Sequence, residues 1–130
     1  MKILIIDDEI EILTLFKDFM EILGHKVEIA IDGQRGLEKF KDAIDNGKNF
    51  DLVIMDYRMY GEDGICVSRE MMNIDKNVKI LFVSADSSVK EKALDMGAVG
   101  FLLKPFDIGA LIKEIEGVLY ANKQEKTSVV

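Results

Sequence analysis

The sequence KILIIDDE at residues 2–9 indicates the fold class, because an apolar run stops there at three acidic residues. A short, continuous apolar run is typical of a parallel β-strand covered on both faces. The pattern returns at residues 52–55 (LVIM), followed by Asp56, and at residues 101–103 (FLL), followed by Lys104. The carboxyl ends of parallel strands share one edge of a sheet, so we expect the charged residues to meet there.

Apolar periodicity alternates between strand-like and helix-like along the chain. Gly24 and Gly97 end two of the helical segments, because glycine readily adopts the backbone conformation that follows a helix C-terminus. Strands that alternate with helices predict an α/β fold, a parallel sheet in a three-layer sandwich with helices on both faces. The predicted strands are 2–6, 26–30, 51–55, 79–83 and 99–103, and the predicted helices are 9–23, 33–46, 65–73, 87–96 and 107–121.

The chain of 130 residues is long enough to bury a substantial core in one domain. We expect residues 1–121 to form this domain and residues 122–130, which are polar and lack periodicity, to form a flexible tail. The net charge is −7, from 17 Lys and Arg against 24 Asp and Glu. This balance disfavours nonspecific binding to nucleic acids and to anionic membranes.

The sequence favours a cytoplasmic location. Cys66 is the single cysteine, so no internal disulfide can form, which suits a reducing compartment. The first apolar run is short and ends in acidic residues, unlike a signal peptide. No stretch approaches the roughly 20 apolar residues of a membrane span.

The predicted charge cluster favours phosphoryl chemistry. Carboxylates that lie close together repel one another, and a divalent cation with one lysine would offset that repulsion. Magnesium prefers oxygen ligands, and a carboxylate nucleophile can form an acyl phosphate. The candidate residues at this edge of the sheet are Asp7, Asp8, Asp56, Ser84 and Lys104.

Taken in order, these motifs resemble the receiver domains of bacterial and archaeal two-component response regulators. The resemblance covers about residues 2–121 and implies a flavodoxin-like, doubly wound sheet of five strands in the order 2-1-3-4-5 with five helices. The chain would be a single receiver of the chemotaxis or phosphorelay type, or a receiver from a longer regulator. The motifs that carry the resemblance are Ile6-Asp7-Asp8-Glu9, Met55-Asp56 with Met59 and Asp63-Gly64, Ser84-Ala85, Gly97-Ala98, and Lys104-Pro105-Phe106.

The resemblance implies a role for each acidic residue. Asp56 would accept a phosphoryl group from a phosphohistidine on a sensor histidine kinase or a histidine phosphotransfer protein. Asp8 would bind Mg²⁺ directly, Asp7 would assist through water, and Arg58 would contribute its backbone carbonyl. The chain would be a signalling switch rather than an enzyme, one that assists its own Mg²⁺-dependent phosphorylation and dephosphorylation.

The resemblance also implies how phosphorylation is read out. Ser84 and Lys104 would each contact a phosphoryl oxygen, and Phe101 would turn inward as Ser84 is drawn toward the phosphate. The surface of the fourth helix, fifth strand and fifth helix would then bind a downstream protein effector. No direct nucleic acid or membrane contact is expected, and the oligomeric state is left open. The bond between Lys104 and Pro105 is expected to be cis.

Two further features depart from the family pattern or go beyond it. Tyr60 stands where the family usually has proline, so the loop after the phosphoacceptor could differ in rigidity. Arg58 and Asp86 lie two residues beyond Asp56 and Ser84, and their opposite charges could pair across the path of the water that hydrolyses the acyl phosphate. This pair is therefore predicted to tune the phosphoryl lifetime.

Three other classes of protein share parts of this pattern. A phosphatase of the haloacid dehalogenase type needs a second aspartate two residues after its nucleophile, and that position is Arg58. A flavodoxin-like flavin carrier needs a Ser/Thr-rich phosphate loop after its first strand, whereas this loop is acidic. An interaction module that is never phosphorylated would gain nothing evident from a complete acidic set.

Overall fold

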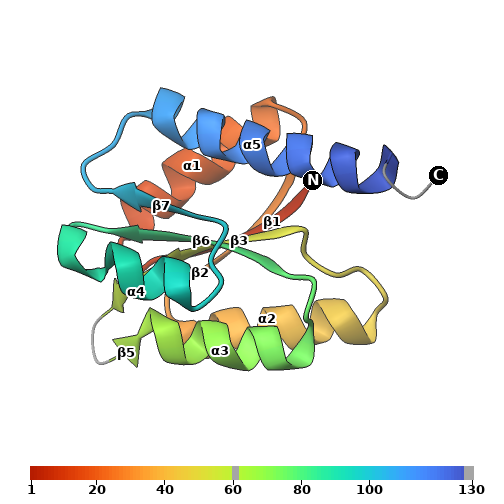
Figure 1. The fold of residues 1–130 in the computed structure, drawn as a ribbon, viewed down its shortest axis with the longest axis horizontal. Coiled ribbons are helices and arrows are strands. Elements are labelled where there is room, and N and C mark those ends of the chain that lie inside the picture. The colour runs from red at the N-terminus through yellow and green to blue at the C-terminus, as the bar shows by residue number, and fades with distance from the viewer. Residues whose placement is uncertain (60–61, 128–130) are drawn as a thin grey trace.

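The computed structural model describes residues 1–59 and 62–127, and its centre is a five-stranded parallel sheet (Figure 1). The strands lie in the order β2-β1-β3-β6-β7, which is 2-1-3-4-5 when the five are counted along the chain, and this confirms the expected topology. Every neighbouring pair is parallel. The strands are β1 (Lys2–Ile6), β2 (Lys26–Ala30), β3 (Leu52–Asp56), β6 (Lys79–Ser84) and β7 (Gly100–Leu103).

Helices cover both faces of the sheet and give the predicted three layers. One face is covered by α1 (Ile10–Ile22) and α5 (Ile108–Thr127), and the other by α2 (Gly33–Asp45), α3 (Gly64–Ile74) and α4 (Lys90–Asp95) (Figure 1). Each face has its own core of buried side chains. All five residues of β3 are buried, which explains the unbroken apolar run that predicted this strand.

Polar side chains and glycines fix where the helices begin and end. Asp32 caps α2 by accepting a hydrogen bond from the backbone N–H of Arg35 at 2.7 Å. Gly24 and Gly97, which follow helices α1 and α4, have φ angles of +94° and +111°, in the region that favours glycine. The sequence signals for these boundaries therefore correspond to real hydrogen bonds and backbone conformations.

The predicted helix end at residue 121 was wrong, because α5 continues to Thr127. Residues 122–127 contain no glycine or proline and include good helix formers such as lysine, glutamine and glutamate. Such a segment extends a helix without supplying an apolar face, so periodicity alone did not reveal it. The remainder of the predicted tail, 128–130, lies outside the described residues.

Two other local predictions differ from the structure. The segment predicted as one helix over 87–96 begins with a 3₁₀ turn, η1 (Ser87–Val89), before α4 starts. The loop after β3 contains a short antiparallel pair, β4 (Arg58–Met59) and β5 (Glu62–Asp63), that was not predicted. Tyr60, the departure from the family pattern, lies outside the described residues.

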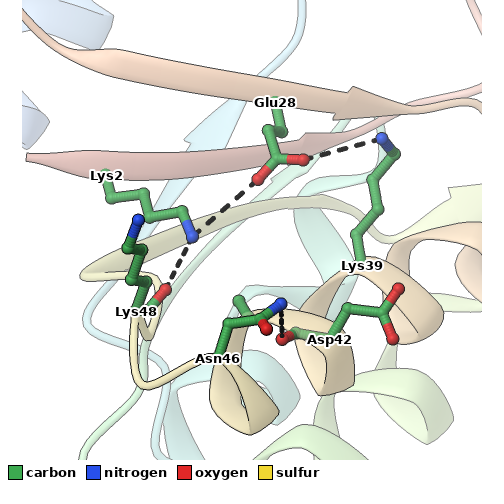
Figure 2. Close-up of a pocket in the computed structure, with 7 residues that line it drawn as sticks. Lys2, Glu28, Lys39, Asp42, Asn46 and Lys48 are labelled. Carbon is green, nitrogen blue, oxygen red and sulfur yellow. Dashed lines mark hydrogen bonds and ion pairs between the residues drawn. The ribbon is translucent and has the colours of Figure 1, made fainter.

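A network of charges joins β1, β2, α2 and the loop before β3 (Figure 2). Glu28 pairs with Lys2 at 3.9 Å and with Lys39 at 3.7 Å. The ammonium of Lys2 also donates to the backbone carbonyl of Lys48 at 2.6 Å and lies 4.5 Å from the centre of the Phe50 ring. These contacts fasten the start of β1 to the elements beside it. Among the described residues, no helix combines the length and apolarity needed to span a bilayer.

Ser68 of α3 is a polar residue that is fully buried. Its exposed fraction is 0%, and its hydroxyl has no hydrogen-bond partner among the described residues. A buried hydroxyl without a partner costs about 1–3 kcal/mol, whereas removing it leaves only a small void.

We therefore predict that Ser68→Ala leaves the free energy of unfolding unchanged or raises it by up to about 1 kcal/mol. Urea denaturation measures this difference. Ala93→Ser, at a position in α4 that is also 0% exposed, is the matched control and should lower the free energy of unfolding. A loss of more than about 1 kcal/mol in Ser68→Ala would contradict the prediction.

Candidate functional site

The sheet brings the predicted charges together because its strands end side by side. The backbone N–H of Asp7 donates to the carbonyl of Ala30 at 3.1 Å, just beyond the ends of β1 and β2. The N–H of Lys104 donates to the carbonyl of Ser84 at 2.8 Å, which continues the pairing of β6 and β7. The charged side chains therefore extend from an ordered edge of the sheet.

Lys104 lies at the centre of the acidic side chains. Its ammonium donates a 3.0 Å hydrogen bond to Asp7 and lies 3.5 Å from a carboxylate oxygen of Asp56. It also pairs with Glu9 at 3.7 Å. The exposed fractions of Asp7 and Asp56 are 5% and 6%, so these interactions are poorly screened by solvent.

Asp7, Asp8 and Asp56 form a group that could hold a metal ion. One carboxylate oxygen from each lies within 4.8 Å of the others. Hard oxygen donors with several positions left for water are the coordination that Mg²⁺ prefers. The donor set therefore fits Mg²⁺ in its chemistry, and the binding of a divalent cation would offset the mutual repulsion of the carboxylates.

The electrostatics of the cluster change the proton affinity of its members. Burial and the nearby charge of Asp7 raise the pKa of Asp56 to about 6, although Lys104 opposes the shift. Burial alone would lower the pKa of Lys104, but its hydrogen bond to Asp7 and the surrounding carboxylates raise the pKa overall. The site is thus short of positive charge in the absence of a metal.

Asp63 and Gly64 hold α3 against the backbone of Asp56. Asp63 caps the helix by accepting a hydrogen bond from the N–H of Ile65 at 2.9 Å. The N–H of Gly64 donates to the carbonyl of Tyr57 at 2.8 Å. A Cβ atom at Gly64 would lie 2.5 Å from the carbonyl oxygen of Asp56, so a side chain there would displace the end of β3.

The remaining predicted residues surround this cluster. Ser84 is 3% exposed, and its hydroxyl accepts a hydrogen bond from the N–H of Asp86 at 3.1 Å. Arg58 and Asp86 form the ion pair that was expected, with a nitrogen–oxygen distance of 3.2 Å. The pKa of Asp86 is lowered, first by its hydrogen bonds from Ser88 and further by Arg58. Phe101 is partly buried and packs on the core beneath α4.

A hollow at this edge of the sheet contains most of the predicted site residues. It is lined by Asp8, Glu9, Asp56, Arg58, Ser84, Ala85, Asp86 and Lys104. Phe101 does not line the hollow and lies in the core instead. The Lys104–Pro105 bond is cis, as expected from the resemblance.

Sequence reasoning gave no role to two residues that shape the site. Glu9 supplies a third carboxylate to Lys104, and its position directly after the aspartate pair was the available signal. Gly64 packs against the backbone of Asp56, and the signal was an Asp-Gly pair at a helix start. Neither contact is evident from residue type alone, because both depend on how the loops return to the sheet.

Comparisons with known proteins agree with this geometry. A family model described as the response regulator receiver domain matches residues 3–116. The chemotaxis protein CheY of Treponema pallidum is 33% identical over 91% of this chain and 82% of that protein. The transcriptional regulatory protein ZraR of Escherichia coli K12 is 33% identical over 90% of this chain but only 26% of its own length, so the chain spans about a quarter of that relative.

A solved structure supports the same relationship. The response regulator protein TrrA of Thermotoga maritima, crystallised in complex with Mg²⁺ and BeF, has a TM-score of 0.77 to this structure. It is 29% identical, and the match covers 90% of this chain and 97% of that chain.

The raised pKa of Asp56 predicts a pH-dependent effect of Asp56→Asn on stability. Because the folded-state pKa is raised from 3.8 to about 6, folding favours the protonated carboxyl, and wild-type stability falls as pH rises through this window. In the absence of divalent cations, Asp56→Asn should match the wild type near pH 4 and exceed it above pH 7, by about 1 kcal/mol after allowance for solvent screening.

Thermal unfolding in a chelating buffer across this pH range measures the difference. Asp18→Asn, at an exposed position on α1, controls for the substitution itself. Addition of Mg²⁺ should reduce the advantage of Asp56→Asn, because the cation stabilises the wild-type carboxylates. A variant that is less stable than the wild type at pH 7.5 without metal would contradict the prediction.

Proposed function

The chain belongs to the response regulator receiver domains, and on this basis we propose that Asp56 is the phosphoacceptor of a two-component system. The observation that carries the proposal is the contact of Lys104 with Asp56 at 3.5 Å, beside Asp7 and Asp8, whose carboxylates complete the acidic group. The proposed donor is a phosphohistidine on a sensor histidine kinase or a histidine phosphotransfer protein.

In the proposed reaction a carboxylate oxygen of Asp56 attacks phosphorus, and the bond from phosphorus to the donor nitrogen or oxygen breaks. Bound Mg²⁺ would neutralise charge that gathers on the phosphoryl oxygens. Asp8 would hold the metal directly, Asp7 would assist through water, and Arg58 would contribute its backbone carbonyl. The complex of TrrA with Mg²⁺ and BeF supports Mg²⁺ as the metal by similarity.

The product would be held by residues that already surround Asp56. Lys104 would pair with one phosphoryl oxygen, and the Ser84 hydroxyl, now bonded to the N–H of Asp86, would turn to another. Phe101 of β7 packs on the core, and its inward movement would carry the change to the surface of α4, β7 and α5. Such a domain is a switch that assists its own phosphorylation and dephosphorylation, rather than an enzyme with a separate substrate.

We propose residues 1–121 as the receiver unit and a downstream protein as the partner of its switched surface. The net charge of −7 disfavours a general affinity of the chain for nucleic acid. Relatives such as ZraR carry the match in only a part of their length, so the output of a longer regulator would come from elsewhere in that chain.

The first prediction of the proposed function tests whether Asp56 is the phosphoacceptor. Incubation with acetyl phosphate and Mg²⁺ should add the mass of one phosphoryl group to the wild-type chain, as measured by intact-protein mass spectrometry. Asp56→Asn should gain none, and replacement of Mg²⁺ by a chelator should abolish the gain because the carboxylates then lack their counter-charge. A wild-type chain that binds Mg²⁺ but gains no phosphoryl group would refute the proposal.

A second prediction concerns the lifetime of the acyl phosphate. Arg58 and Asp86 pair with each other and both line the hollow, so they would obstruct a water that approaches the acyl phosphate. The double replacement of both by alanine should speed phosphate loss by up to about fivefold, the factor that corresponds to about 1 kcal/mol for an exposed ion pair.

The control is the Asp32–Arg35 pair, which has the same 3.2 Å distance and also involves a capping aspartate, but does not line the hollow. Replacing that pair by alanine should leave the lifetime unchanged. Decay is followed by intact mass after removal of the donor. An unaltered lifetime in the Arg58/Asp86 double variant would show that the pair does not shield the acyl phosphate.

A further inference from the structure

An apolar hollow lies beside the acidic one, between the first half of α1 and the loop after β7. Phe16 and Phe106 form part of its wall, with their rings stacked at a centroid distance of 5.5 Å. Leu15 also lines it and is 62% exposed. The lining residues are Glu9, Ile12, Leu15, Phe16, Ala85, Lys104, Pro105 and Phe106.

The two hollows are continuous. Glu9, Ala85 and Lys104 line both of them. The ammonium of Lys104, at this boundary, is 3.5 Å from the carboxylate of Asp56. A molecule whose anionic end reaches Asp56 would therefore have an apolar wall directly beside it.

The apolar hollow suits an uncharged group attached to an anionic one. Its ionic side chains are Lys104 and Glu9, which pair with each other at 3.7 Å, and the rest of its lining is hydrocarbon apart from the backbone. Its volume is about 520 Å³, within the roughly 300–1,000 Å³ of pockets that hold small molecules. An unpaired cation or anion would gain little there, whereas an aryl or branched alkyl group would lose contact with water.

We propose that this hollow holds the acyl group of a small acyl phosphate, so that the chain accepts phosphoryl groups from aromatic or branched acyl phosphates in preference to acetyl phosphate. The inference rests on the proposed function, because it requires Asp56 to be the acceptor. The Asp56 oxygen forms a bond to phosphorus, the bond from phosphorus to the acyl oxygen breaks, and the leaving group departs with that electron pair as a free carboxylate. No proton or further reactant is needed.

The geometry of transfer explains why the acyl group would meet this wall. The attacking and leaving oxygens lie roughly in line at phosphorus, so the leaving group points away from Asp56 and toward the rim of the acidic hollow. Where the two hollows meet, Ala85 offers a small side chain and Lys104 offers a cation to the donor's phosphoryl oxygens. Beyond them lie Leu15 and Phe106.

The test compares benzoyl phosphate with acetyl phosphate as donors to the full chain in the presence of Mg²⁺. Benzoate and acetate are leaving groups of similar basicity, so a rate difference mainly reports contacts of the acyl group. The rate of phosphoryl gain at low donor concentration, followed by intact mass, should be about tenfold higher with benzoyl phosphate, the factor expected for about 1.4 kcal/mol of added contact.

Variants on α1 locate the effect. Leu15→Asn should reduce the ratio of the benzoyl to the acetyl rate to about threefold or less, because it places an amide in the apolar wall. Ile22→Asn is the matched control, since Ile22 lies on the same helix, is 82% exposed and does not line the hollow. That control should keep the wild-type ratio.

Each outcome either supports or overturns the proposal. A wild-type ratio near one, or an equal loss in both variants, would overturn the proposal and leave an apolar side chain of a protein partner as the occupant of the hollow. A ratio near ten that only Leu15→Asn reduces would support it. If acetyl phosphate itself adds no phosphoryl group, the proposed function fails, and that result is distinct from the loss of donor preference alone.

Discussion

The contact of the Lys104 ammonium with Asp7 and Asp56 is the interaction on which the site depends. Strand pairing brings Asp7, which follows β1, and Asp56, the last residue of β3, to one edge of the sheet, where burial strengthens their repulsion. One lysine does not balance them, and the pKa of Asp56 stays near 6. The fold thus maintains a local shortage of positive charge, which a bound divalent cation would relieve.

The alternation of strands and helices and the positions of the charged residues could be predicted because both follow from local patterns, whereas the strand order was implied by the family resemblance. Apolar runs marked the strands, and the residue after each run marked the edge of the sheet. The Arg58–Asp86 pair could also be anticipated, because each residue stands two positions beyond a strand-end residue. Such inferences need only the strand register and the parallel topology.

Features that depend on how loops fold back could not be predicted in this way. The contact of Gly64 with the Asp56 carbonyl, and the short β4–β5 pair before it, arise from the path of one loop. The end of α5 was missed for another reason, because helix propensity continued after the apolar periodicity stopped. The apolar hollow combines residues from α1 with residues that follow β7, so no single segment of sequence predicts it.

The two halves of the site, the acidic residues and the lysine, follow strands that differ in how many neighbours they pair with. β1 and β3, which carry the acidic residues at their ends, have a paired neighbour on both sides, whereas β7 is an edge strand that pairs only with β6. Lys104 follows that edge strand and is tied to the sheet through the carbonyl of Ser84. The anionic half of the site is therefore the rigid part. Its cation belongs to the half that can shift without disturbing the other strand pairs.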